Sequence, residues 1–159
     1  MNKKIKTLLV GLGSEIGSTL ISMTSSKKET IQITGVITNE IFKKDLRKNL
    51  ESLIARIVIN EPEMINRISF NEKESSLIIN KNKIRIFWGN VKKVDLNKIN
   101  TKFDITIIAT SKDHINDKTF MKKFLKVSKF VFGVAESNNL PSIYPNIINT
   151  KSKFFEKKP

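Results

Sequence analysis

The hydrophobic positions of this chain fall into short apolar runs that alternate with stretches of three- and four-residue spacing. Three runs, 5–10, 31–38 and 103–109, are apolar, rich in strand-forming residues and bounded by turn residues, which predicts buried strands. Helical spacing follows the first two runs, over 15–25 and 42–59. Strands that alternate with helices predict an α/β fold with a mostly parallel sheet.

The middle of the chain carries weaker strand patterns. The pieces 66–70, 76–80 and 83–88 are short and strand-like, and Lys81-Asn82 between the last two is a plausible hairpin tip. We therefore predict a small antiparallel excursion from the parallel sheet, which Trp88-Gly89-Asn90 closes.

The last third predicts a helix at 117–127, a strand at 130–134, a loop at 135–139 and a final short strand at 143–148. Neither an internal repeat nor a long linker divides the chain. We therefore expect one domain over residues 1–150, followed by a basic C-terminal tail, 151–159.

A glycine-rich turn follows the first predicted strand. Gly11, Gly13 and Gly17 form G-x-G-x-x-x-G, one residue longer than the dinucleotide fingerprint G-x-G-x-x-G. Free N–H groups and the dipole at a helix start favour a phosphate. Glu15 lies inside the turn, where its charge would repel a pyrophosphate, and a tight turn that needs glycine only for its backbone gives the same pattern. The order of elements predicts a Rossmann-type, doubly wound sheet, and the phosphate role stays open.

Polar residues follow the second and third strong strands. Asn39 and Glu40 come directly after the second one, where an acidic residue of a Rossmann unit hydrogen-bonds the adenosine ribose. A carboxylate stabilised by a helix dipole is the alternative. Thr110 and Ser111 follow the third strand, at the edge where open α/β sheets bind ligands, although helix capping would use the same hydroxyls.

Composition removes several kinds of chemistry. The chain has no cysteine, which excludes a disulfide framework, a thiol nucleophile and a thiolate metal site. Its single histidine, His114, argues against a zinc site or a histidine-based triad and is expected at the surface, in a loop or first helical turn. No apolar run reaches about 18 residues, so we expect no membrane span and a cytoplasmic protein.

The net charge of +14 comes mostly from lysines spread along the chain. It predicts a surface that attracts anionic ligands or acidic partners. Nucleic acid is the less favoured partner, because neither an arginine-rich tract nor an RNA-binding aromatic motif accompanies the lysines.

Several landmarks occur in the order found in one family. The stretch 10–18 stands where that family has Ile-Asn-Gly-Phe-Gly-Arg-Ile-Gly-Arg, and 39–42 where it has Asn-Asp-Pro-Phe. The stretch 77–87 follows Leu-x-Ile-x-Gly-x-x-Ile-x-Ile-Phe, and 108–111 and 129–137 match two later strand ends. From residue 3 to about 150, the chain resembles the NAD-binding half of phosphorylating glyceraldehyde-3-phosphate dehydrogenase.

By this resemblance the turn at 11–17, with Ser14 in it, binds the pyrophosphate of NAD, and Glu40 binds the adenosine ribose. The other residues that the resemblance implies at the cofactor are Ile16 in the fingerprint, Asn90 near the adenine, and Thr110 and Ser137 on the nicotinamide side. Glu40 favours NAD over NADP because a carboxylate repels a 2′-phosphate, whereas Lys43 and Lys44 would reverse that preference.

The sequence also departs from the family pattern. Ser14-Glu15 occupies the place of the fingerprint arginine. The family's nucleophilic cysteine and catalytic histidine belong to a second domain, for which we expect no counterpart in residues 1–159. Without a thiolate the family reaction has no nucleophile, so we expect the chain alone to be inactive.

Three functions remain open. The first is a cofactor-binding or regulatory NAD(P) module. The second is a protein-interaction module with a decayed cofactor site, which binds another chain or a second copy of itself. The third, less favoured, is a basic nucleic-acid-binding protein.

Overall fold

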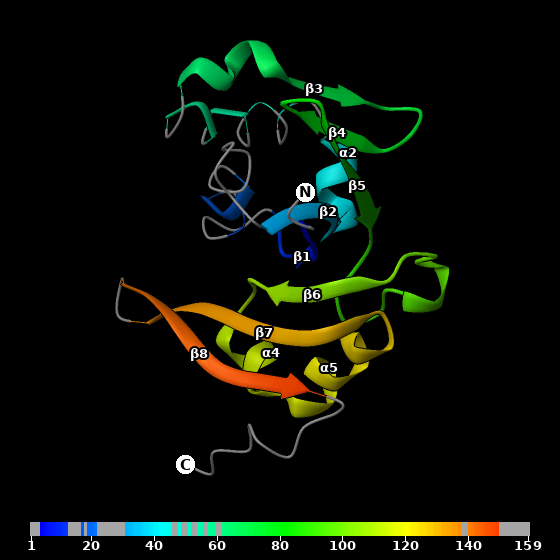
Figure 1. Cartoon of the computed structure of the whole chain (residues 1–159), viewed down its shortest axis with the longest axis vertical. Helices are drawn as coiled ribbons and strands as arrows, with labels where there is room; N and C mark the ends of the chain where they lie inside the picture. Colours follow the sequence, from blue (N-terminus) through cyan, green and yellow to red (C-terminus); the bar gives the residue numbers. More distant parts are fainter. Residues whose placement is uncertain are drawn as a thin grey trace.

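The computed structural model describes residues 4–12, 17, 19–21, 31–45, 48, 51, 54–55, 57–59, 62–137 and 140–149. These residues form a mixed α/β fold around one eight-stranded sheet (Figure 1). The strands are β1 (Ile5–Val10), β2 (Ile31–Thr38), β3 (Ile68–Asn71), β4 (Ser76–Ile79), β5 (Asn82–Trp88), β6 (Phe103–Ile108), β7 (Ser128–Ser137) and β8 (Leu140–Asn149). The helices are α2 (Glu40–Lys44), α4 (Lys112–Asn116) and α5 (Lys118–Lys123), with 3₁₀ turns η1 (Pro62–Arg67), η2 (Leu96–Lys98) and η3 (Phe124–Lys126).

The centre of the sheet is parallel. Its strand order is β3-β4-β5-β2-β1-β6-β7-β8, and the five strands from β5 to β7 all run in one direction. Val10 at the end of β1 pairs with Ile37 of β2 on one side and Ile108 of β6 on the other. After β5 the chain crosses β2 and β1 to enter β6. The carboxyl ends of these strands therefore meet at one edge.

Both outer parts of the sheet are antiparallel. The predicted antiparallel excursion is confirmed for β3 and β4. Its third piece, β5, also pairs parallel with β2 and so belongs to the parallel centre, which corrects the prediction. The hairpin tip between β4 and β5 is one residue earlier than predicted, because Asn80 and Lys81 adopt φ of 52° and 69°, the left-handed pair of a tight type I′ turn. The final strand predicted at 143–148 is confirmed as β8, which is longer than predicted. At the edge opposite β3 it runs antiparallel to β7 (Figure 1), a direction that the sequence pattern did not indicate.

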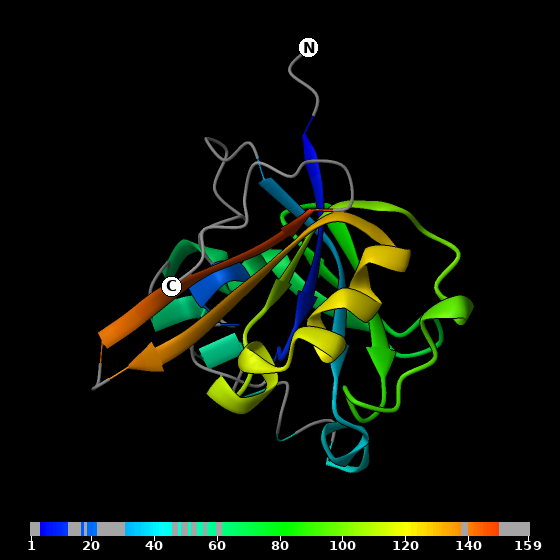
Figure 2. The ribbon, with the colours of Figure 1, turned by 90° about the horizontal axis from the view of Figure 1, so that it is seen from below.

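The two faces of the sheet each carry a hydrophobic core, because successive side chains of a strand point to opposite faces. Leu8 and Val10 join a cluster that includes Phe120, Met121 and other residues of α4 and α5. Leu9 joins a second cluster on the other face, with Ile21, Ile57 and Met64 among its members. Figure 2 shows α4 and α5 lying over one face of the sheet.

The predicted helices are only partly as expected. The pattern over 42–59 is interrupted, since α2 ends at Lys44 and Asp45 has non-helical φ and ψ of −109° and 43°. The described positions from 48 to 59 are again helical. In the part of the chain that the structure describes, none of the helices is both long and apolar enough to cross a membrane.

The last third differs from its prediction in two places. The helix expected at 117–127 is α5 followed by η3, and its predicted inner face is confirmed, because Phe120, Phe124 and Val127 are buried. The loop expected at 135–139 is wrong for its first residues, since β7 continues to Ser137 by pairing with β8. Most of the helix expected at 15–25, and the tail, lie outside the described residues.

A close approach fixes α4 on the sheet. A Cβ at Gly133 of β7 would lie 2.3 Å from Cγ2 of Ile115 in α4. Ile115 is fully buried, so α4 packs directly on the β7 backbone. This contact brings the residues of α4 to the carboxyl edge of β6.

Candidate functional site

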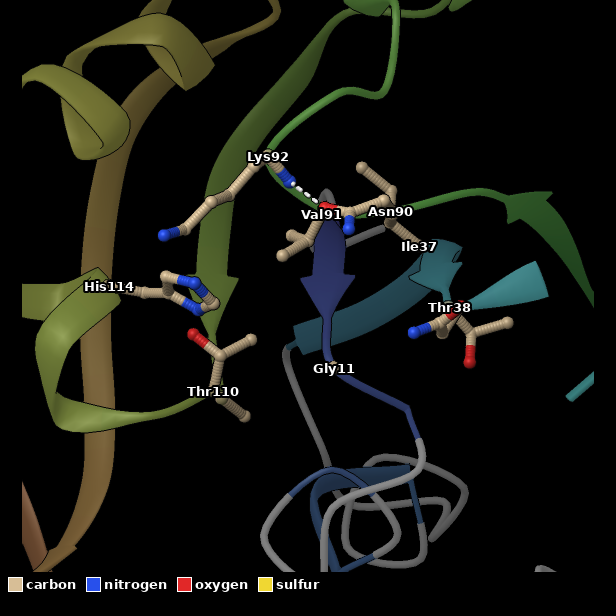
Figure 3. A pocket seen from close by; sticks show the side chains of 10 residues that line it. Gly11, Ile37, Thr38, Asn90, Val91, Lys92, Thr110 and His114 are labelled. Carbon is tan, nitrogen blue, oxygen red and sulfur yellow. Dashed lines mark hydrogen bonds between the residues drawn. The ribbon is translucent and has the colours of Figure 1, made fainter. Parts of the chain in front are cut away.

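A pocket of about 500 Å³ opens at the carboxyl edge of the parallel strands (Figure 3). It lies at the ends of β1, β2, β5 and β6, beside the crossing from β5 to β6. The lining residues are Gly11, Ile37, Thr38, Asn39, Asn90, Val91, Lys92, Ala109, Thr110 and His114. Four residues that the sequence nominated from separate segments, Gly11, Asn39, Asn90 and Thr110, thus meet in one cavity.

Gly11 allows three strand ends to come together. Its φ is +99°, and its N–H donates to the Ile37 carbonyl at 3.0 Å. A Cβ at this position would lie 2.1 Å from the Ala109 carbonyl oxygen. Glycine is therefore required by the backbone here.

Asn39 and Glu40 have different surroundings. The Asn39 side-chain oxygen accepts a hydrogen bond from the Ile41 N–H at 3.2 Å and caps α2. Glu40 is the first residue of α2 and is exposed. It is adjacent to a lining residue and does not itself line the pocket.

The hydroxyls of Thr110 and Ser111 do not cap the helix that follows. Ser111 is the N-cap of α4, and its side chain makes no capping hydrogen bond within the described chain. Thr110 Oγ1 is enclosed and has no hydrogen-bond partner among the described residues. Helix capping, the alternative role for these hydroxyls, is therefore not what this geometry uses.

His114 lies in the first turn of the short helix α4, one of its two expected places, but it is half-buried and lines the pocket, so it is not simply a surface residue. Its ring stacks on Phe120 with centroids 5.0 Å apart, and its Nδ1 is enclosed. Burial, and next the positive charge of Lys92, lower the pKa of His114 below its ordinary value, although Asp113 and Asp117 oppose this. The only sequence signal was its position four residues beyond Thr110.

Lys92 lines the pocket although the sequence pattern did not indicate it. A side chain of α5 holds the loop that carries Lys92. Lys123 Nζ of α5 donates to the carbonyl oxygens of Val91 at 2.7 Å and Lys92 at 3.0 Å. The same ammonium lies over the Phe120 and Phe124 rings, and burial lowers its pKa. The loop after β5 is thereby tied to α5.

The other nominated residues that the structure describes do not line the pocket. Gly17 is helical and buried, and Ser111 is exposed next to Thr110. Ser137 pairs with Leu140 at the end of β7, four residues beyond Gly133, which pairs with Ile108. Gly13, Ser14, Glu15 and Ile16 lie outside the described residues.

The described lining is cationic. Lys92 and His114 are its ionisable residues, and none of the described lining residues is a carboxylate. The described residues likewise contain no group of three or more histidine, cysteine, aspartate or glutamate side chains that would hold a metal. An anionic ligand fits this lining better than a cation does.

The lowered pKa of His114 predicts a pH dependence of stability. Below its ordinary pKa of 6.5 the unfolded chain binds a proton that the folded chain resists, so His114 should make the protein less stable as the pH falls. We expect the free energy of unfolding, measured with urea at pH 7.5 and pH 5.5, to fall more between these pH values for the wild type than for His114→Gln. Equal losses in the two proteins would contradict the effect, because carboxylate titration is common to both.

Neither protein-family models nor curated proteins yield a match to this sequence. The resemblance to glyceraldehyde-3-phosphate dehydrogenase therefore stays a prediction.

Proposed function

We propose that this chain is an NAD(P)-binding domain of the Rossmann type, with the cofactor in the pocket at the ends of β1, β2, β5 and β6. The observation that carries this proposal is the position of the pocket. Ligands of open α/β sheets bind outside the carboxyl ends of the strands, where the chain reverses its direction of travel across the sheet. The pocket lies at that place, between the segments that follow β1 and β6.

The strand order supports the same proposal. Numbered along the chain, the five parallel strands β5-β2-β1-β6-β7 have the order 3-2-1-4-5, which is the order of the first five strands in the Rossmann fold. Hydrophobic clusters on both faces of this sheet agree with a doubly wound arrangement, in which helices cover both faces.

The size and charge of the pocket suit an anionic nucleotide. Its volume of about 500 Å³ is within the usual range of roughly 300–1,000 Å³ for small-molecule and cofactor sites. Lys92 and His114 face it, and the overall charge of +14 would attract a dinucleotide by long-range electrostatics.

The proposed role is cofactor binding or regulation, and not complete dehydrogenase catalysis. The chain has no cysteine to form the covalent thiohemiacetal from which the family of glyceraldehyde-3-phosphate dehydrogenase transfers a hydride. A domain that binds the cofactor without this nucleophile could still report the cofactor's concentration or redox state to a partner.

Calorimetric titration with NAD and NADP tests the proposal. We expect NAD to bind, and Glu40→Ala to weaken it by about ten- to a hundredfold, because a hydrogen bond to a charged group contributes about 1.5–3 kcal/mol. The affinity for NADP should fall little, because Glu40→Ala also removes a charge that repels the 2′-phosphate. Glu63→Ala is the matched control, since Glu63 is an exposed carboxylate of η1 and, unlike Glu40, has no pocket-lining residue next to it in the chain.

Two results would contradict the proposal. The first is the absence of heat and of protection against unfolding up to millimolar NAD and NADP. The second is equal weakening by Glu40→Ala and Glu63→Ala, which would show a surface-charge effect. Without cofactor binding, the alternative of an interaction module with a decayed site becomes the better hypothesis.

A further inference from the structure

Two buried polar atoms beside the pocket have no hydrogen-bond partner among the described residues. They are Oγ1 of Thr110 and Nδ1 of His114. Figure 3 shows the Thr110 hydroxyl and the His114 ring turned toward each other at the end of β6. Since buried polar atoms are nearly always paired, and these two face each other, we expect them to pair with each other after a small adjustment of either side chain.

The Thr110 hydroxyl is a suitable partner for the imidazole in either of its charge states. It is able to donate to Nδ1 of the neutral ring, and by rotating it is able to accept from Nδ1–H of the imidazolium. In the neutral case the ring proton resides on Nε2. Because Nδ1 is enclosed, Nε2 is the ring nitrogen left for an interaction with a ligand, and it offers a proton to that ligand.

Lys92 adds a positive charge to the same side of the pocket. Its side chain is exposed, lines the pocket and extends toward His114 (Figure 3). Its backbone is held in place, because its N–H donates to the Asn90 side chain at 2.9 Å and its carbonyl accepts from Lys123. A cation and an N–H donor that face one space are the elements of a site for an oxyanion.

We propose that Lys92 and His114 form an anion subsite on the β6 side of the pocket, which binds the phosphate or carboxylate group of a small molecule, and that Thr110 positions the imidazole. The subsite stands independently of dinucleotide binding. The anion belongs either to the dinucleotide itself or to a second small molecule bound beside it.

Binding at this subsite couples to proton uptake. In the free protein, desolvation and the charges of Lys92 and Lys123 disfavour the imidazolium, whereas Asp113 and Asp117 favour it. The other face of the ring is covered by Phe120, which carries no charge. An anion next to Nε2 adds a strong interaction with the imidazolium, so the His114 pKa rises when the anion binds. Affinity then increases as the pH falls.

The single histidine makes this coupling measurable. We expect the pKa of His114, followed by NMR of the ¹³C-labelled imidazole, to rise by about one pH unit when sodium sulfate saturates the full-length protein. Sulfate is the probe because it does not titrate in this range, and sodium chloride at equal ionic strength is its control. A pKa that is the same in sulfate and chloride overturns the proposal.

Three variants assign the roles. Lys92→Gln should lower sulfate affinity by about tenfold, whereas Lys93→Gln, an exposed neighbour outside the pocket lining, should leave it unchanged. Thr110→Val should change the His114 pKa and reduce its rise with sulfate, and Thr110→Ser should restore both. Equal effects of the two lysine variants on sulfate affinity would contradict the assignment. So would a Thr110→Val protein in which the His114 pKa and its rise with sulfate are those of the wild type.

Three ligands then identify the source of the anion. Inorganic phosphate, acetate and NAD are titrated separately against the His114 resonance. A response to NAD that exceeds that of phosphate at equal concentration assigns the anion to the dinucleotide, and a response to phosphate or acetate that persists with NAD bound assigns it to a second molecule. A response to none of the three overturns the subsite. Failure of NAD alone assigns the anion to a second molecule, and the calorimetric titration decides separately whether NAD binds.

Discussion

Gly11→Ala is expected to lower the free energy of unfolding by about 3–5 kcal/mol, which combines left-handed backbone strain with overpacking against a fixed neighbour. Gly11 has a φ of +99°, which alanine adopts poorly. The new Cβ would also lie 2.1 Å from the Ala109 carbonyl oxygen, a backbone atom that cannot rotate away.

The structural consequence should extend to the pocket. The Ala109 N–H donates to the Val10 carbonyl, and the Gly11 N–H donates to the Ile37 carbonyl, so a shift of residue 11 strains both neighbouring strands. Any ligand of the pocket should therefore bind the variant more weakly than the loss of stability alone explains.

Gly35→Ala is the matched control, measured by urea unfolding under the same conditions. The nearest atoms to its added Cβ are side-chain atoms, including Cε2 of Phe87 at 3.1 Å and Cδ1 of Leu8 at 3.3 Å. These groups are able to move by a few tenths of an ångström, so Gly35→Ala should lower the free energy of unfolding by about 1 kcal/mol. Equal losses for the two variants would mean that Gly11 is not held as described.

Phe124→Ala is expected to lower the free energy of unfolding by about 3–5 kcal/mol, because it removes a large side chain from a closed core and leaves a cavity. Phe124 is fully buried and makes an edge-to-face contact with Phe120 at 5.4 Å. Its cluster joins α4 and α5 to β1 and β6, so the cavity would lie beneath the elements that carry His114 and Lys123.

The same substitution should loosen the loop after β5. The Lys123 ammonium lies over the Phe124 ring at 5.2 Å and donates to the carbonyls of Val91 and Lys92. Faster amide hydrogen exchange at Val91 and Lys92, relative to the global unfolding rate, would register the change. Leu125→Ala, in the same turn and only partly buried, should cost less and leave this loop unchanged. Equal effects of the two variants would contradict the role of Phe124.

The parallel strands were predictable because their patterns are local. The runs 5–10, 31–38 and 103–109 contain few polar residues, and the strands β1, β2 and β6 occupy almost the same bounds. A strand that packs on both faces must be apolar along most of its length, so its apolar run is visible in the sequence. The helical spacing of Phe120 and Phe124 likewise predicted that these two side chains share one buried face.

The edges and breaks were not predictable in this way. The loop expected at 135–139 is strand as far as Ser137 because β8 supplies its hydrogen bonds, and no residue in that stretch encodes its distant partner. The break at Asp45 and the short helix α4 were missed because the hydrophobic spacing continues through the first and is too brief to reveal the second.

By itself, the sequence determined the α/β alternation, the central strands and the absence of a thiol nucleophile, since each of these follows from residue type or from local periodicity. Only the tertiary structure decided which strand ends meet and what faces the space between them. His114 enters the pocket because α4 packs on β7 at Gly133, and Lys92 because Lys123 holds its loop. The two contacts join residues that are 18 and 31 positions apart in the chain, and no local pattern determines which distant segments pack together.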